Sequence, residues 1–262
     1  MMRMIAHQVQ VVQALASSVT ALGRGMGGTA FPKQPSKPLK LYEFEGCPYC
    51  RRVREILTTL NLDVEIYPCP KNGTRFRPLV EKIGGKAQFP FLIDENTGDQ
   101  LYESKDIIAH LFQHYSAEAK VPKQYQYYPP LPVVGTLSSI VSGLYGMVAN
   151  TSNKKMPAPE KLLELWSFEA SPYSRVVRAK LTELEIPYIL HNVAKERWQD
   201  QGPAALRLKP GQYIPLAGGK REKIMQRLGG RVQVPYLEDP NTGIKMFESA
   251  DINAYLKKQY GG

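Results

Sequence analysis

The sequence predicts an α/β fold made of two similar units, each a mixed β-sheet flanked by helices. The first observation is an internal repeat: residues 41–67 recur at 165–191, shifted by 124, and residues 88–107 recur at 233–252, shifted by 145. The second is the alternation, in each copy, of short apolar runs with amphipathic stretches. The two shifts differ by 21 residues, which places an insertion near 194–214 in the second copy. A chain of 262 residues is long enough for two such cores.

Each element of the first copy follows from its residue pattern. The apolar runs 41–44 and 63–67 predict strands on either side of an amphipathic helix. A second helix ends at Gly84-Gly85, because glycine commonly follows the last helical turn. The expected elements after the first strand are the helix 51–60, the strand 63–67, the helix 75–83, a hairpin of 91–94 and 100–102 around Asn96-Thr97-Gly98, and the helix 104–115. This order is that of a thioredoxin-type α/β sandwich.

Two thiols mark the point where the first strand ends and the first helix begins, in Cys47-Pro48-Tyr49-Cys50. The free N–H groups and positive dipole of a helix start lower the pKa of a thiol, and the thiolate is the reactive form. Cys47 is therefore the candidate nucleophile and Cys50, one turn inside the helix, the candidate resolving thiol. Three arginines near the helix start favour the thiolate, whereas Glu43 and Glu45 oppose it. The alternative is a pair of buried structural cysteines.

The second copy has hydroxyls in place of both thiols, since the motif becomes Ser171-Pro172-Tyr173-Ser174. This predicts a degenerate site that binds or only packs. Its expected members are Ser171, Ser174, Val234, Pro235, Glu248 and Ser249.

The chain resembles the thioredoxin-like domain that opens glutathione S-transferases, and also glutaredoxins, over most of 39–115 and 161–260. The resemblance rests on CPYC after the first strand, on Gln88-Phe89-Pro90, and on Tyr102-Glu103-Ser104 before the last helix. In detail it looks like the plant and algal plastid proteins that carry two such domains in tandem. It implies two tandem thioredoxin-like domains of the glutathione transferase N-terminal or glutaredoxin type, joined by a proline-rich, partly apolar linker.

The resemblance also implies a glutathione site in the first copy. It implies cis peptide bonds before Pro90 and Pro235, which turn the preceding backbone toward the thiol. Ser104 and the helix start suit the γ-glutamyl carboxylate, and Glu103 its ammonium group. Without the resemblance, Glu103-Ser104 is an ordinary capping signal. The expected glutathione-binding residues are Tyr49, Phe89, Pro90, Glu103 and Ser104.

Two departures from the family limit the activity that it implies. Glutaredoxins usually have a lysine three positions before the nucleophile, where this chain has Phe44. The serine Ser171 can lower the pKa of a glutathione thiol in a transferase, but transferases also carry an all-helical domain after the first unit. Only about 45 residues separate the two copies here, which makes a conjugating transferase the weaker reading.

The first 38 residues hold four basic and no acidic side chains. Such a segment resembles an organelle transit peptide and predicts a plastid protein. A disordered tail on a cytoplasmic protein is the alternative.

The linker, 116–160, holds Tyr127-Tyr128-Pro129-Pro130-Leu131-Pro132 and an apolar stretch, 133–148, expected to form a packed helix or hairpin. Peripheral membrane contact is the alternative, because the stretch is short for a membrane span. The linker, or the second copy with its insertion, is also a candidate surface for a protein partner.

The charge pattern and the cysteine count exclude other classes. The net charge is +10, yet the first copy has 10 basic and 11 acidic residues and the second 16 and 11, without a basic cluster interleaved with aromatics. Nucleic-acid binding is therefore not expected. The single CxxC lacks a second pair of zinc ligands, so no metal site is expected, and Cys69 is expected to be a buried hydrophobe.

The leading hypothesis is a glutathione- or thioredoxin-type thiol–disulfide oxidoreductase that acts on glutathione or a protein disulfide through Cys47 and Cys50. No tightly bound cofactor is expected, and glutathione is a cosubstrate. The competing hypothesis is a non-catalytic scaffold of paired thioredoxin folds that binds a protein. Glutathione conjugation through Ser171 is a third.

Overall fold

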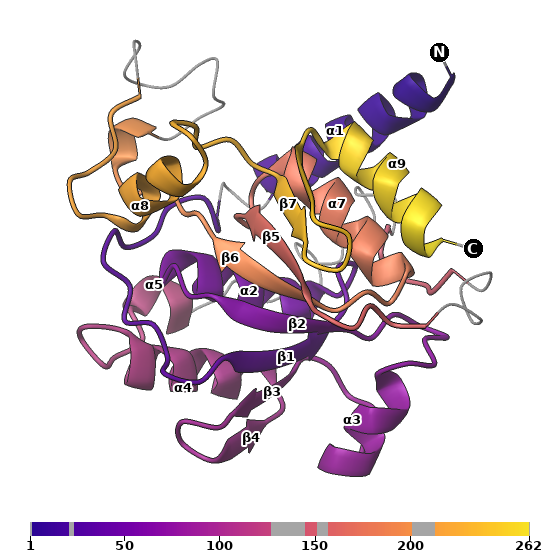
Figure 1. Cartoon of the computed structure of the whole chain (residues 1–262). Coiled ribbons are helices and arrows are strands. Elements are labelled where there is room, and N and C mark those ends of the chain that lie inside the picture. The colour runs from indigo at the N-terminus through magenta and orange to yellow at the C-terminus, as the bar shows by residue number, and fades with distance from the viewer. Residues whose placement is uncertain (1, 21–23, 127–144, 151–156, 201–212, 262) are drawn as a thin grey trace.

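One continuous eight-stranded sheet runs through the molecule in the order β4-β3-β1-β2-β6-β5-β7-β8 (Figure 1). This computed structural model describes residues 2–20, 24–126, 145–150, 157–200 and 213–261. Each half of the sheet comes from one copy of the repeat, because β1 to β4 belong to the first and β5 to β8 to the second.

The first repeat has the elements that the sequence predicts, with shifts of a few residues at their ends. Its first helix begins three residues earlier than expected, at Pro48, because proline suits the first helical position. Cys47 thereby becomes the residue that caps the helix. The elements are β1 (Leu39–Glu43), α2 (Pro48–Thr59), β2 (Val64–Pro68), α3 (Arg77–Gly84), β3 (Phe91–Asp94), β4 (Asp99–Leu101) and α4 (Ser104–Tyr115), followed by α5 (Lys123–Gln126).

The second repeat has the same order of elements, and its insertion lies between β6 and α8. The described part of the insertion contains the short 3-10 helix η2 (Trp198–Asp200), while residues 201–212 lie outside the described residues. The other elements are β5 (Leu163–Ser167), α7 (Pro172–Glu183), β6 (Tyr188–Asn192), α8 (Lys220–Arg227), β7 (Tyr236–Asp239), β8 (Ile244–Phe247) and α9 (Ser249–Tyr260).

The two repeats are joined edge to edge by antiparallel pairing of β2 with β6. The central pair is Glu65 with Ile189, flanked by Val64 with Leu190 and Ile66 with Tyr188. Within each repeat the first two strands are parallel and the last two antiparallel, so the sheet is mixed. The expected α/β fold with mixed sheets flanked by helices is confirmed.

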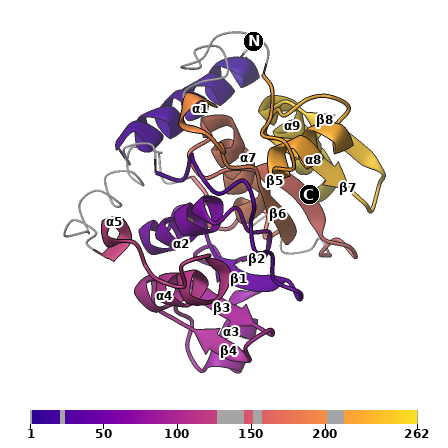
Figure 2. The same ribbon diagram turned by 90° about the vertical axis from the view of Figure 1, so that its left-hand side faces the viewer.

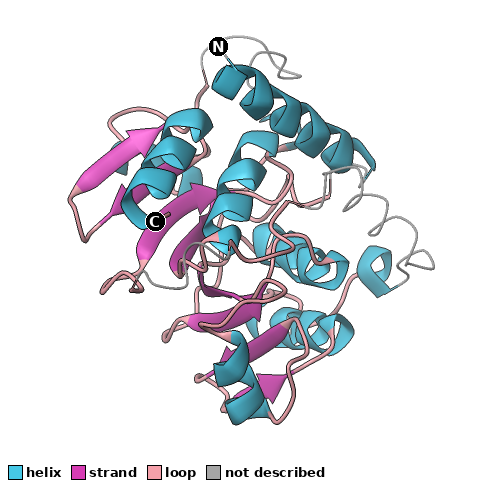
Figure 3. Cartoon of the chain, turned by 90° about the vertical axis from the view of Figure 1, so that its right-hand side faces the viewer, coloured by secondary structure: helices cyan, strands magenta, loops and turns pink. Residues whose placement is uncertain are grey.

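Alternating side chains of the central strands pack against different helices on the two faces of the sheet. Leu41 lies in a core cluster with residues of α2 and α4, whereas its neighbour Tyr42 packs in a cluster with Val80 of α3. The same alternation holds in the second repeat, where Leu165 joins the large cluster and Trp166 packs with Ile224 of α8. The large cluster runs through both repeats, and Figures 2 and 3 show its helices stacked along one side of the sheet.

Helix α1 (Met2–Thr20) lies alongside α7 of the second repeat (Figures 1 and 2). Val11 and Ala14 are buried there in a small cluster with Val176. Downstream of α1, the side-chain amide of Gln34 donates to the carbonyl of Asn61 at 3.0 Å. The described part of 1–38 therefore packs against both repeats. The expectations of a transit peptide and of a tail on a cytoplasmic protein both stay predictions.

Two short segments with the same conformation, one before each repeat, bond to the opposite repeat. These Gly-Met segments are residues 24–29 and 145–150. The first bonds to the second repeat, where Ala170 N–H donates to Gly25 O at 3.0 Å. The second bonds to the first repeat in the corresponding way, where Gly46 N–H donates to Gly146 O at 3.3 Å. Each repeat is thus held at the loop before its CPYC or SPYS motif.

Glycine is required at the turn of both Gly-Met segments. Gly25 and Gly146 have φ of 74° and 71°, in the left-handed region that side chains rarely adopt. A Cβ on Gly25 would also lie 2.7 Å from Cβ of Glu169, and one on Gly146 would lie 2.8 Å from Cβ of Glu45. Any side chain at either position would push the segment away from the opposite repeat.

The described helices include none that is both long and apolar enough to cross a membrane. Most of the apolar linker stretch, and the proline cluster before it, lie at 127–144, outside the described residues.

Candidate functional site

The thiol of Cys47 caps helix α2 and accepts a hydrogen bond from within its own motif. Cys47 has extended backbone angles (φ −79°, ψ 122°), which turn its side chain back over the first helical turn. The N–H of Cys50 donates to Sγ of Cys47 across 3.3 Å. Both cysteines are free thiols. A sulfur that accepts a helix N–H carries charge more easily, so the cap favours the thiolate.

The two thiols have opposite acidities. The hydrogen bond with Cys50 lowers the pKa of the Cys47 thiol, although burial and the Glu43 carboxylate act against this. Burial raises the pKa of Cys50 well above its ordinary value, and the hydrogen bond with Cys47 adds to the rise. Cys47 is therefore the more acidic of the two thiols, and its role as the nucleophile stays a prediction.

The serine motif of the second repeat has the same local geometry as the cysteine motif. Ser171 caps α7 with φ −71° and ψ 115°, and its hydroxyl accepts from the N–H of Ser174 at 3.3 Å. Both hydroxyls are buried like the thiols that they replace. The sequence change at this site thus altered the chemistry and left the backbone as it was.

The cis-proline step lies next to the strand end that leads into the CPYC loop. The Phe89–Pro90 and Val234–Pro235 peptide bonds are both cis, as expected. The ring of Phe44, at the end of β1, meets the ring of Phe89 edge-on with centroids 6.2 Å apart. The guanidinium of Arg77 stacks over Phe89 at 4.7 Å. Two aromatic rings and a guanidinium group therefore lie at Phe44, the position where glutaredoxins usually have a lysine.

Glu103 and Glu248 hold the same unusual backbone conformation before the last helix of each repeat. Their φ angles are 60° and 65°, which is rare for residues other than glycine and often marks a functional position. Neither side chain caps its helix. Glu103 instead accepts from the side-chain amide of Gln88, beside Phe89. The ordinary capping interpretation of Glu103 is therefore wrong.

The serine after each glutamate differs in its surroundings between the repeats. Ser104 and Ser249 are both buried at the first turn of α4 and α9. In the second repeat, Nε2 of His7 on α1 lies 3.0 Å from the Ser249 hydroxyl. Helix α1 thus contacts the start of α9 through this pair.

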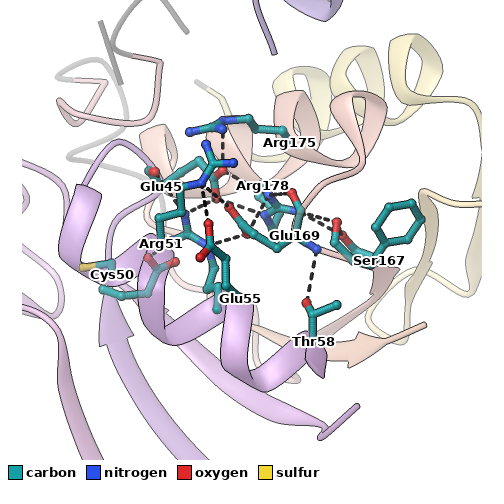
Figure 4. A network of polar contacts seen from close by, with 12 residues as sticks. Glu45, Cys50, Arg51, Glu55, Thr58, Ser167, Glu169, Arg175 and Arg178 are labelled. Carbon is teal, nitrogen blue, oxygen red and sulfur yellow. Dashed lines mark hydrogen bonds and ion pairs between the residues drawn. The ribbon is translucent and has the colours of Figure 1, made fainter. Parts of the chain in front are cut away.

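A buried network of arginines and glutamates joins the helix that carries CPYC to the helix that carries SPYS (Figure 4). Arg54 of α2 donates to Oε2 of Glu169 at 2.9 Å, and also bonds to the Glu43 carboxylate and the Glu45 carbonyl. Arg178 of α7 occupies the corresponding position in the second repeat. Its Nε and Nη2 donate to the two carboxylate oxygens of Glu45 at 3.0 and 3.1 Å.

Most of the charged side chains that neighbour the thiols in the sequence take part in this network. Burial raises the pKa of Glu43 to about 7 against the pull of Arg54, while Glu169, although buried, has its pKa lowered to about 2 by Arg178 and Arg54. Arg51 bonds to Glu55 at 3.1 Å in the same network. Arg51 and Arg54 of α2 therefore bind carboxylates of this network, and the hydrogen bonding with Cys50 is the main cause that lowers the pKa of Cys47.

Met147 of the second Gly-Met segment covers the loop before Cys47. A Cβ on Gly46 would lie 2.4 Å from Cγ of Met147 and 2.7 Å from its sulfur, so the side chain rests directly on this glycine. The exposed fraction of Cys47 is 4%, although that of Tyr49, two residues on, is 50%. Cys47 thus caps the start of α2, next to the glycine on which Met147 rests.

Two further repeated patterns in the sequence mark parts of this site and were not used to predict it. The pairs Glu45 with Glu169 and Arg54 with Arg178 recur at the repeat spacing of 124, and Gly25-Met26 recurs as Gly146-Met147. Periodicity alone does not say that these residues meet across the junction, because the contact depends on the pairing of β2 with β6.

Comparisons with known proteins identify a family for this chain through one family model. A solved glutathione transferase of Bombyx mori is 28% identical over 38% of this chain and 43% of its own chain, with a TM-score of 0.28. The chain thus spans less than half of that transferase's length. No curated protein matches. The family model described as the N-terminal domain of glutathione S-transferase matches residues 41–119 and 165–262, more than half of the sequence. The chain therefore belongs to the family of glutathione S-transferase N-terminal domains.

Proposed function

We propose that the protein is a thiol–disulfide oxidoreductase that uses Cys47 as the nucleophile and glutathione as cosubstrate. The observation that carries this proposal is that the backbone N–H of Cys50 donates to the Cys47 sulfur at a helix start, where the pKa of the first thiol is lowered and that of the second is raised. A structural pair of cysteines has no need of such a difference. Exchange needs one thiol that ionises early and a second within reach to resolve the mixed disulfide.

The exchange balances without any further oxidant or metal. The Cys47 thiolate attacks a disulfide, forms a mixed disulfide and releases one thiolate. The Cys50 thiol loses its proton, attacks Sγ of Cys47 and releases the second substrate thiolate, which leaves a Cys47–Cys50 disulfide. Two glutathione molecules reduce this disulfide and become one molecule of glutathione disulfide.

Residues of three loops support the binding of glutathione beside Cys47. The exposed Tyr49 offers a ring, and the Phe89-Pro90 step presents backbone groups to an extended peptide. Glu103 suits the γ-glutamyl ammonium and Ser104, at the start of α4, its carboxylate. The second repeat has no thiol at its motif, and His7 engages Ser249, so its proposed role is structural or in binding.

The test is glutathione-dependent reduction of a small mixed disulfide by the full chain. Cys47→Ser is expected to abolish turnover, and Cys50→Ser to retain part of it because glutathione itself can resolve the mixed disulfide. Cys69→Ser is the matched control, since Cys69 is a buried thiol outside the motif. Equal turnover by the wild type and the Cys47→Ser variant, with both folded, would refute the proposal.

The burial of Cys47 favours a second candidate, a scaffold that binds a protein partner. Met147 covers the loop before the thiol, and the exposed faces of the insertion include Trp198, whose exposed fraction is 68%. In a scaffold, the Cys47→Ser variant keeps its partner and its cellular role. Affinity capture with wild type and variant, followed by an assay of cell phenotype, separates the two candidates.

Glutathione conjugation through Ser171 has less support. The Ser171 hydroxyl is buried and already accepts from Ser174, so a glutathione sulfur would have to displace the cap. Turnover of a model electrophile that disappears in Ser171→Ala and survives in Cys47→Ser would favour it.

A plastid location is proposed from the acid-free segment 1–38. Fusion of this segment to a fluorescent protein tests it, and a cytoplasmic signal would refute it.

A further inference from the structure

Three potential metal ligands meet on the first repeat, away from the CPYC motif. Asp99 at the start of β4 and His110 and His114 on α4 place one ligand atom each within 4.8 Å of the others. The two histidines are four residues apart, which puts both on one helix face, and their ring centroids are 4.5 Å apart. Nδ1 of His110 lies 3.6 Å from a carboxylate oxygen of Asp99.

A buried carboxylate fixes the orientation of His110. Nε2 of His110 lies 2.8 Å from Oδ2 of Asp94, which is fully buried and also accepts from Tyr115 at 2.5 Å. An imidazole that donates Nε2–H to a carboxylate presents the lone pair of Nδ1 on its other side. Here that side faces Asp99, so an acceptor nitrogen and an anionic oxygen point to the same place.

We propose that Asp99, His110 and His114 form a binding site for a divalent cation of the zinc type, which ties the β3–β4 hairpin to α4. Two imidazoles and one carboxylate are a common donor set for zinc, with a fourth position left open. The pair of Asp94 with His110 is the carboxylate–histidine arrangement that usually stands behind a metal ligand.

The second repeat shows that the fold itself does not need these three residues. Its counterparts are Ile244, Tyr255 and Gln259, none of which is a zinc ligand of this kind. The buried partners are nevertheless kept, because Asp239 accepts from Tyr255 at 2.6 Å and from Tyr260 at 2.5 Å. A tyrosine can therefore satisfy the buried carboxylate. His110 has a second ring nitrogen, Nδ1, on the side of Asp99. In the first repeat this histidine occurs together with the other two ligands, Asp99 and His114.

Small side-chain movements would complete the site. Around a tetrahedral zinc, ligand atoms about 2.0 to 2.1 Å from the metal lie about 3.3 to 3.4 Å from each other. The three ligand atoms here lie within 4.8 Å of one another. His110 is held in place by Asp94, while the Asp99 side chain is 48% exposed and His114 is half-buried, so these two can rotate to close the gap.

The test measures binding of Zn²⁺ alone to the full chain by competition with a chromophoric chelator. All variants carry Cys47→Ser and Cys50→Ser, which remove the thiols of the motif as competing ligands. His110→Tyr copies the second repeat and should preserve the bond to Asp94 and the fold. His114→Gln copies it at the other histidine, on a less buried residue. His7→Gln is the matched control, a histidine on α1.

We expect one equivalent of zinc in the parent and in His7→Gln, and at least about a tenfold loss of affinity in both His110→Tyr and His114→Gln. Zinc should also raise the melting temperature of the parent and not that of His110→Tyr. Absence of binding in the parent would overturn the proposal, leaving His110 as a partner of two aspartates. So would equal affinity in the parent and the two histidine variants, because the zinc would then lie elsewhere.

Discussion

Arg178 of the second repeat binds both carboxylate oxygens of Glu45, which stands two residues before Cys47 in the first repeat. Arg54 makes the corresponding contact with Glu169, two residues before Ser171. The loops that lead into the two motifs are thus each fixed by the helix that follows the other motif. Substitutions at the junction of the repeats should therefore alter the loops that lead into the thiol site.

Removal of Arg178 should destabilise the whole chain. Arg178→Met leaves the buried carboxylates of Glu45 and Glu169 without a main partner, and breaking a buried ion pair in this way costs about 3 to 5 kcal/mol. Urea unfolding measures the loss. Because Gln has no charge to leave unpaired, adding Glu45→Gln to Arg178→Met should restore part of the stability.

Arg175→Met is the matched control on the same helix. Arg175 is also buried, but burial and the nearby Arg51 lower its pKa to about 10, so its charge is poorly compensated. Its removal should cost less than that of Arg178. An equal loss for the two variants would contradict the importance given to the contact between Arg178 and Glu45.

Shortening Met147 should expose Cys47. Met147→Ala removes the side chain that rests on Gly46, and the loss of roughly 1 kcal/mol of apolar contact raises the open population about fivefold. The rate of Cys47 alkylation by iodoacetamide, followed by mass spectrometry, measures this. Met26→Ala changes the same position of the other Gly-Met segment and should leave the rate unchanged. Equal acceleration in both variants would point to general loosening of the fold.

Stability should depend on His191 as the pH rises above about 6.5. Burial lowers the pKa of His191, but its hydrogen bonds to Asp63 and Glu164, both at 3.0 Å, more than offset this and raise it. A raised histidine pKa contributes stability that is full below about pH 6.5 and is lost as the pH rises through the folded value. The free energy of unfolding of the wild type minus that of His191→Gln should therefore fall across this range. A flat difference would contradict the bridge.

Thiols at the second motif should be able to pair. Because the Ser171 hydroxyl accepts from Ser174 in the same way as the Cys47 sulfur accepts from Cys50, the double variant S171C/S174C has the backbone for a disulfide. In a background with Cys47→Ser and Cys50→Ser, oxidation should remove both introduced thiols and two hydrogens of mass. S171C alone, the control, should keep its thiol. A double variant that folds and stays reduced would show that the two motifs differ in more than their sulfur atoms.

The fold followed from local patterns because strands and helices in this chain obey simple periodicity. The last helix was expected at 104–115 and lies there, and β3 was expected at 91–94 and lies there. The start of α2 was placed three residues late because Cys47-Pro48-Tyr49 has no apolar period. The proline at its first helical position was the signal for the earlier start.

The site was harder to foresee because its charges meet through tertiary contacts. From the sequence alone, the charge of the three arginines near Cys47 is expected to favour its thiolate. In the structure Arg54 lies among Glu43, Glu45 and Glu169, and the last of these comes from the other repeat. The contact of Met147 with the loop before Cys47 was not predicted for the same reason, because Met147 is 100 residues from Cys47 in the chain.

The most direct test of the account is the pKa of the Cys47 thiol, measured as the pH dependence of its alkylation rate in a Cys69→Ser background with the two thiols distinguished by mass spectrometry. The account predicts that Cys47 reacts first, with a pKa below the ordinary thiol value of about 8.5, and that Cys50 reacts only well above it. A Cys47 pKa at or above the ordinary value, or a Cys50 that reacts first, would contradict the assignment of Cys47 as the nucleophile of a thiol–disulfide exchange site.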